Sequence, residues 1–241
     1  MTLYLSLFVY SLVLLVLPLQ ISYAVESEGP ISTNVFEYDA SVGFLDAGTL
    51  TLELTEFKDK YEVLGRFESS RALSKYYTWN GVFAAKGHWE EGARKTDGYF
   101  VRSEGSDDHF KMVILSEREA RLLEGIGEEF ETIARPGGTD LISGLFFGSG
   151  CYKDELLHDG EDFYPVKAVK IKSTKLVSTD LYVSGKALEC TYQVSDRKQR
   201  RRKIYVTQTQ HQGTAVAAKI RIAISFFPDP TFRLRRQYST N

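Results

Sequence analysis

Few side chains of this sequence stand in the patterns that catalytic sites require. His158 precedes Asp159, and an aspartate beside a histidine can orient the imidazole as a general base. Gly148-Ser149-Gly150 lacks the GxSxG spacing of a nucleophile elbow. The histidines show no HxxxH or HExxH spacing; they are His88, His109, His158 and His211. We therefore expect no catalytic, cofactor-binding or metal-binding residues, and keep an envelope hydrolase that depends on His158 or Asp159 as the least favoured alternative.

Two cysteines, Cys151 and Cys190, offer redox chemistry of a different kind. Their separation excludes the CxxC motif of a disulfide oxidoreductase. In an oxidising compartment they could pair and close a loop over residues 152–189, which would stabilise the fold by about 4 kcal/mol. The alternative is two buried free thiols in neighbouring strands, because a sequence gives no Cα separation.

A basic run lies between two segments of alternating polarity, where we expect the tip of a hairpin. Its six cations are Arg197, Lys198, Arg200, Arg201, Arg202 and Lys203. Each cation near a charged bilayer contributes about 1 kcal/mol to binding, so the run predicts docking to anionic lipid headgroups, lipopolysaccharide or acidic polysaccharide. The alternative is a solvated turn that balances acidic residues elsewhere. A net charge of −2 and the lack of a helix or finger motif argue against nucleic acid as a partner.

Charge is divided unevenly along the chain. Residues 25–162 hold 14 Lys and Arg against 28 Asp and Glu, whereas residues 163–241 hold 16 against 4. If both parts belong to one sheet, opposite charges on facing strands favour docking of the two parts on each other.

The first 24 residues predict export. Leu3 to Leu17 is almost continuously apolar, no charged side chain precedes Glu26, and Ser22 and Ala24 are small residues at the −3 and −1 positions of a cleavage site. We expect residues 1–24 to be a signal peptide and the mature protein to be periplasmic if the source is a Gram-negative bacterium. An uncleaved membrane anchor is the alternative.

The secondary structure that holds these residues in place is expected to be mainly β-strand, because apolar residues alternate with polar ones along the chain. With 43% hydrophobic residues, the chain can form a folded core. We predict a mainly β fold, a strongly curved antiparallel sheet or incomplete β-barrel with one short helix, in a single domain over residues 25–241. The inward residues of the expected strands are Phe36, Tyr38, Ala40, Val42 and Phe44; Leu50, Leu52 and Leu54; Tyr61, Val63, Gly65 and Phe67; Leu188, Cys190, Tyr192 and Val194; and Ile220, Ile222, Ile224 and Phe226.

Turns and the helix are marked by their own residues. Asp46-Ala47-Gly48 predicts the first turn, and Pro228-Asp229-Pro230 the turn of a final hairpin. Asp140 is expected to cap a short helix with an apolar face, such as can fill the open end of a β fold. Strands are expected over 110–115 and 130–133 rather than a helix starting at Ser116, because Gly125 and Gly127 follow soon after.

Residues 38–50, YDASVGFLDAGTL, resemble the opening strand-turn-strand of the exported bacterial family called domain of unknown function 3108. The residues that carry the resemblance are Tyr38, Gly43, Ala47 and Gly48, with weaker matches at Asp140, Ser143, Asp159, Gly160 and Cys190. The resemblance implies an envelope protein with a curved antiparallel sheet and brings no catalytic residues. The basic run departs from the family pattern. Independently of the family, Gly43 and Gly48 can supply a positive φ or a bulge.

The expected function is binding rather than catalysis. The chain has 15 Phe, 14 Tyr and 2 Trp, which either fill the concave side of the sheet or line a groove for an acyl chain or sugar rings. We expect an exported, non-enzymatic binding or carrier module for a lipid or glycan of the envelope, without a cofactor. The alternative is a structural or assembly factor that docks on an envelope protein complex.

Overall fold

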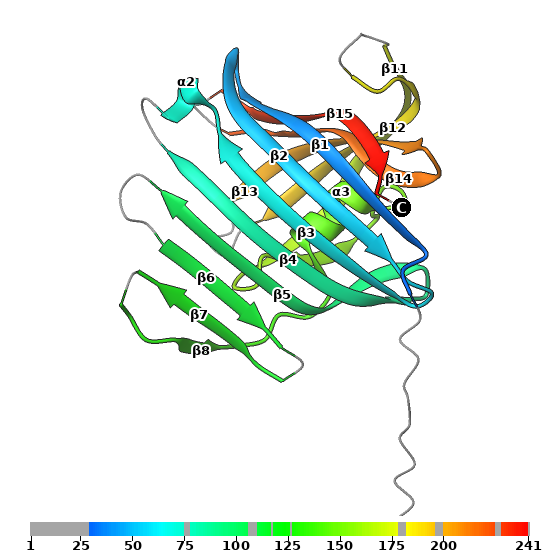
Figure 1. Ribbon diagram of the computed structural model, residues 1–241. Helices are drawn as coiled ribbons and strands as arrows, with labels where there is room; N and C mark the ends of the chain where they lie inside the picture. Colours follow the sequence, from blue (N-terminus) through cyan, green and yellow to red (C-terminus); the bar gives the residue numbers. More distant parts are fainter. Residues whose placement is uncertain are drawn as a thin grey trace, which may run out of the picture.

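A single curled sheet organises the molecule. The computed structural model describes residues 29–74, 78–105, 110–116, 118–125, 127–177, 182–195, 200–224 and 228–240. Within these ranges fifteen strands form one sheet in the order β8-β7-β6-β5-β4-β3-β2-β1-β15-β14-β13-β12-β11-β10-β9 (Figure 1). The described neighbours are antiparallel except for the parallel pair β9–β10. The mainly β, strongly curved, barrel-like fold expected from the sequence is confirmed; the predicted signal peptide lies outside the described residues.

The elements follow one another as a meander on each side of the β1–β15 pair. The strands are β1 Ser32–Val42, β2 Leu45–Glu56, β3 Lys60–Ser69, β4 Trp79–Glu90, β5 Ala93–Gly105, β6 Phe110–Leu115, β7 Ala120–Glu124, β8 Glu131–Ile133, β9 Thr139–Asp140, β10 Glu155–His158, β11 Phe163–Leu176, β12 Gly185–Ser195, β13 Arg201–His211, β14 Thr214–Ile222 and β15 Pro230–Ser239. The helices are the expected α3 Leu141–Phe147 and a four-residue helix that the sequence did not suggest, α2 Arg71–Ser74.

The first hairpin turns earlier than predicted. Its two-residue turn is Gly43-Phe44, where Gly43 has a φ of +62°. The prediction that Phe44 is an inward residue of the first strand is wrong, because it lies in this turn and is fully exposed. The predicted turn at Asp46-Ala47-Gly48 is wrong: these residues belong to β2, and Ala47 is the extra residue of a β-bulge opposite Ala40 and Ser41. Gly48 has a φ of +144°, so glycines satisfy both the turn and the bulge.

Most of the predicted inward residues are buried, including Leu52, Val63 and Tyr192. Leu188 differs: it lies within β12, as its fourth residue, and remains 39% exposed. Ile224 follows the end of β14 and is half-buried, while Phe226 lies outside the described residues. Alternation therefore identifies most of the inner face, and it fails at Leu188 within β12 and beyond the ends of the strands.

Helix α3 fills the concave side of the sheet. Asp140 caps it as predicted, accepting a hydrogen bond from the Ser143 backbone amide at 2.8 Å. Phe147 packs edge-on against Phe36 with ring centroids 5.2 Å apart, and Phe146 packs against Tyr38 at 5.0 Å. The aromatic residues of the interior are thus core, and the barrel is plugged by its own helix (Figure 1).

A polar latch fastens the sheet edge β9 to strand β5. The Thr96 amide donates to the Gly138 carbonyl at 3.1 Å, and the Asp140 amide donates to Thr96 Oγ1 at 2.9 Å. Thr96 Oγ1 donates in turn to Asp140 Oδ2 at 2.9 Å, while Tyr61 Oη lies 3.2 Å from the same hydroxyl. All these side chains are buried. The contact draws the sheet toward closure and leaves β6, β7 and β8 as an extension beyond it (Figure 1).

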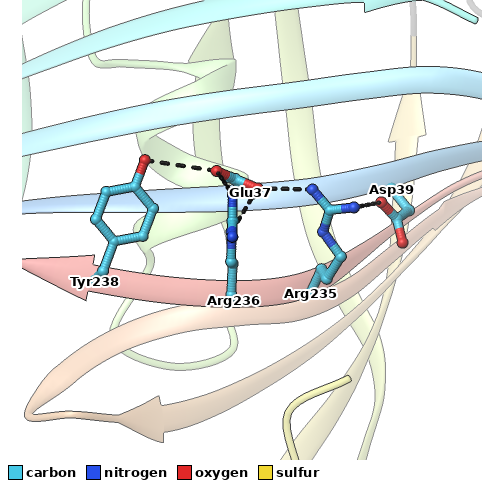
Figure 2. Close-up of polar contacts among 5 residues, drawn as sticks. All are labelled: Glu37, Asp39, Arg235, Arg236 and Tyr238. Atoms are coloured by element: carbon cyan, nitrogen blue, oxygen red, sulfur yellow. Dashed lines mark hydrogen bonds and ion pairs between the residues drawn. The ribbon is translucent and has the colours of Figure 1, made fainter. Parts of the chain in front are cut away.

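Ion pairs join the first and last strands, β1 and β15, along the seam where they pair (Figure 2). A bulge in β15 opposite Glu37 and Tyr38 places Arg235 and Arg236 on the same outer face. Arg236 makes two 2.7 Å hydrogen bonds to Glu37, and Arg235 donates to Glu37 at 2.7 Å and lies 3.6 Å from Asp39. The hydrogen bond from Arg236 is the main cause that lowers the pKa of Glu37. Basic residues of the C-terminal part therefore pair with acidic residues of the N-terminal part at this seam, as the uneven charge distribution predicted.

Candidate functional site

The histidine next to an aspartate is enclosed rather than placed in a cleft. His158 is fully buried, and its Nδ1 accepts a hydrogen bond from the Gly160 amide at 3.2 Å. Burial lowers the pKa of His158, which keeps the ring neutral near pH 7. Asp159 accepts from the amides of Glu161 and Asp162 and from the Tyr164 hydroxyl, so it holds a turn. These contacts give both residues structural roles.

A different histidine has an aspartate partner. His88 Nδ1 on β4 lies 2.8 Å from Asp97 Oδ2 on β5. Asp97 is the extra residue of a bulge between the register pairs Lys86–Gly98 and Gly87–Thr96. Sequence reasoning missed this pair because the two residues come from neighbouring strands. Both side chains are 43% exposed, so solvent screens their interaction.

Gly160 and the two cysteines, which the sequence also singled out, have structural roles. Gly160 has a φ of +91°, and a Cβ there would lie 2.5 Å from a Val113 methyl group, so only glycine fits the turn that starts at Asp159. The half-buried Cys151 and the buried Cys190 form a disulfide with Cα atoms 5.5 Å apart. This bond ties the segment after α3 to β12, and it decides between the two alternatives that the sequence left open.

The described cations of the basic run do not form one cluster. Arg197 and Lys198 lie outside the described residues, and Arg200 is exposed just before β13. Arg201, Arg202 and Lys203 start β13, where side chains alternate between the two faces of the sheet. Arg202 lies opposite the buried Val194, whereas Arg201 and Lys203 are exposed on the convex face. The described part of the run therefore follows the connection between the paired strands β12 and β13 and continues into β13, where the charges of Arg201, Arg202 and Lys203 are divided between two faces.

Cross-strand pairing extends the convex part of the run into a larger surface. Lys203 lies opposite Gln193, and Gln193 lies opposite Lys167 of β11. Lys170 and Lys172 follow on β11 with the same outward direction, opposite Thr191 and Glu189. We call the residues Lys167, Lys170, Lys172, Arg201 and Lys203 the basic face. All five are exposed.

The basic face carries charge that the fold leaves uncompensated. Within the described part of the chain, none of its five cations forms an ion pair. Other cations of the C-terminal half are used internally: Arg235 and Arg236 bind Glu37, and Arg221 lies 2.6 Å from Asp229. Strand β12 separates β11 from β13, so the two rows of cations lie about 10 Å apart, and alternate residues along each strand lie about 7 Å apart. This spacing allows several anionic groups of one surface to be contacted at once.

Sequence reasoning missed the three lysines of the basic face on β11. The sequence does show a repeated pattern of lysines here, at positions 167, 170, 172 and 175, which could have indicated a positively charged strand. The register with β12 and β13, which places Lys167 and Lys203 on either side of Gln193, is a property of the sheet.

A second feature of the convex side is an apolar groove across β2 to β6, of about 480 Å³. Register pairs align four of its lining residues in a row, Leu64, Ala84, Phe100 and Ile114, with one residue from each of four adjacent strands. Leu64 is 56% exposed. The small side chain of Ala84 lies in this row between the larger Leu64 and Phe100, which leaves space for the groove. Its volume is typical of a site that binds a ligand or a side chain.

Comparison with protein-family models and with curated proteins finds no match. Membership of the family called domain of unknown function 3108 therefore stays a prediction. One solved structure has a similar fold, a β-barrel-like protein of domain of unknown function DUF1849 from Brucella abortus. The TM-score is 0.53 over 87% of this chain and 98% of that chain, at 10% sequence identity.

Neither helix among the described residues is long and apolar enough to cross a bilayer.

Proposed function

We propose that this chain is an exported, non-enzymatic binding protein of the cell envelope that contacts an anionic lipid or acidic glycan through the basic face. The single observation that carries the proposal is the set of five exposed cations on β11 and β13 that have no ion-pair partner among the described residues. The filled interior is the reason for proposing the outside of the sheet, because α3 occupies the space in which an acyl chain would be carried.

The predicted localisation agrees with this chemistry. A disulfide between Cys151 and Cys190 is consistent with an oxidising compartment, and the apolar segment before Pro18 with export. Phosphate and carboxylate groups on lipid headgroups and polysaccharides share the negative charge that clustered lysines and arginines attract. The binding is expected to weaken as salt is raised, because exposed charges are screened within a Debye length of about 8 Å at physiological ionic strength.

The first prediction concerns Arg201→Ala combined with Lys203→Ala. We expect affinity for vesicles of phosphatidylglycerol and phosphatidylethanolamine to fall by about 2 kcal/mol, roughly 30-fold, because each cation near the membrane surface contributes about 1 kcal/mol. Vesicle co-sedimentation at low and high salt measures it. A parallel titration with a soluble acidic polysaccharide distinguishes a lipid ligand from a glycan.

The matched control is Arg71→Ala with Arg118→Ala, which removes the same charge from exposed positions outside the basic face. This control should bind the anionic vesicles and polysaccharide like the unchanged protein. Equal binding by both double variants, or equal affinity of the unchanged protein for phosphatidylcholine vesicles, would refute the proposed role of the basic face.

The apolar groove supports a second candidate function, an assembly factor that docks on an envelope protein complex. A photoreactive amino acid in place of Leu64 is expected to crosslink one dominant protein in intact cells, because this side chain is exposed in the groove. The control position is Phe44, which is more exposed but lies in the β1–β2 turn. Identical products at both positions, or no protein product at Leu64, would count against docking at the groove.

A further inference from the structure

Strand β11 presents a long unpaired edge. It has fourteen residues, but β10 pairs only with Phe163–Val166. Beyond this point the Ala168 amide donates to the Tyr152 carbonyl, and the stretch from Val169 to Leu176 has β12 as its described strand neighbour. Among the described residues no backbone hydrogen bond occupies the other side of this stretch, so its amides and carbonyls can pair with an added strand.

The side chains along this edge combine positive charge with exposed apolar surface. Lys170, Lys172 and Lys175 are exposed, and Val169 and Ile171 are 52% and 53% exposed. Lysines alone would protect an edge from pairing. The exposed apolar side chains beside them favour an edge that accepts a strand of opposite charge.

The other end of the sheet has that charge. Strand β8 pairs with β7 on one side only, and it is short and exposed. Glu128, Glu129 and Glu131 lie on or just before β8 and are exposed, as is Phe130 at 41%. Within the described residues these three glutamates form no ion pair. The two sheet edges are therefore complementary, one acidic and one basic, and each has an exposed apolar residue.

We propose that two copies of this chain associate head to tail, with the acidic β8 edge of one copy adding to the basic β11 edge of the next. The contact cannot form within one copy, because β8 and β11 lie at opposite sides of the molecule (Figure 1). Pairing of two β11 edges would oppose lysine to lysine, and pairing of two β8 edges glutamate to glutamate, which like-charge repulsion disfavours. Pairing of unlike edges is heterologous and can continue from copy to copy.

The test uses two charge-reversed variants of the purified full-length protein in sedimentation velocity over a concentration series. The β11 variant is Lys170→Glu with Lys172→Glu, and the β8 variant is Glu129→Lys with Glu131→Lys. The unchanged protein should associate with rising concentration and dissociate at high salt. Each variant alone should associate at least about tenfold more weakly, because it opposes like charges.

An equal mixture of the two variants should regain association, because the acidic β8 of the first meets the unchanged basic β11 of the second. The charge-swapped edges are also complementary. A monomer at every concentration, or a mixture that sediments as two separate variants, would overturn the proposal. Arg201→Ala with Lys203→Ala should self-associate normally, since it leaves both edges intact. That control separates this proposal from anion binding, which depends on the basic face.

Discussion

Asp140→Ala is expected to lower the free energy of unfolding by about 3 kcal/mol. The substitution leaves the Ser143 amide and the Thr96 hydroxyl without their acceptors in a buried site, and each lost charge-assisted bond contributes about 1.5 to 3 kcal/mol. It removes the α3 cap and part of the β5–β9 latch together. Urea denaturation followed by circular dichroism measures the change.

Asp140→Asn is the matched control for that experiment. Asparagine caps helices about as well as aspartate and keeps an acceptor for the Ser143 amide, so we expect a loss of about 1 kcal/mol from the altered contact with Thr96. If Asp140→Ala were as stable as Asp140→Asn, the cap bond to the Ser143 amide would contribute nothing to stability, because asparagine keeps that acceptor and alanine removes it. Equal stability of Asp140→Ala and the unchanged protein would contradict both roles.

Removal of the disulfide is expected to have a similarly large effect. Cys151→Ser with Cys190→Ser should lower the free energy of unfolding by about 4 kcal/mol, because the bond closes a loop across a sequence separation of 39 residues and restricts the unfolded chain. The buried Cys190 position adds the effect of placing a hydroxyl in an apolar site. Thermal unfolding of oxidised and variant protein provides the comparison.

Reduction of the unchanged protein separates these two contributions. Reduced protein keeps its thiols, so its loss of stability should be smaller than that of the double serine variant but of the same order. The variant itself should be insensitive to reductant. If reductant left the unchanged protein as stable as before, the pair would have no role in holding the segment after α3 against β12.

Features that depend on near neighbours along the chain can be predicted from the amino-acid sequence. Period-two alternation identified Leu52 and Val63 as inward residues, because successive side chains of a strand lie on opposite faces. Asp140 could be recognised as a helix cap because its acceptor serves an amide three residues later. The mainly β fold class follows from the same local periodicities, which need no knowledge of pairing.

Local signals were weaker at turns and bulges. The sequence suggested a turn at Asp46-Ala47-Gly48, but the chain turns at Gly43-Phe44 and uses the later glycine for a bulge. Glycine serves both conformations, so its type alone does not distinguish them. One inserted residue then decides which side chains share a face, as Arg235 and Arg236 do beside Glu37.

The candidate sites were decided by tertiary structure. Lys167 and Lys203 share a face because each pairs with Gln193, and Thr96 meets Asp140 although 44 residues separate them. Such contacts depend on strand order and register. These are set by interactions between segments far apart in the sequence, which a local pattern of residues does not reveal. The sequence therefore determined what kind of sheet forms and which side chains it buries. Only the curled arrangement of that sheet decided that the interior is filled by α3 and that the uncompensated charge lies outside.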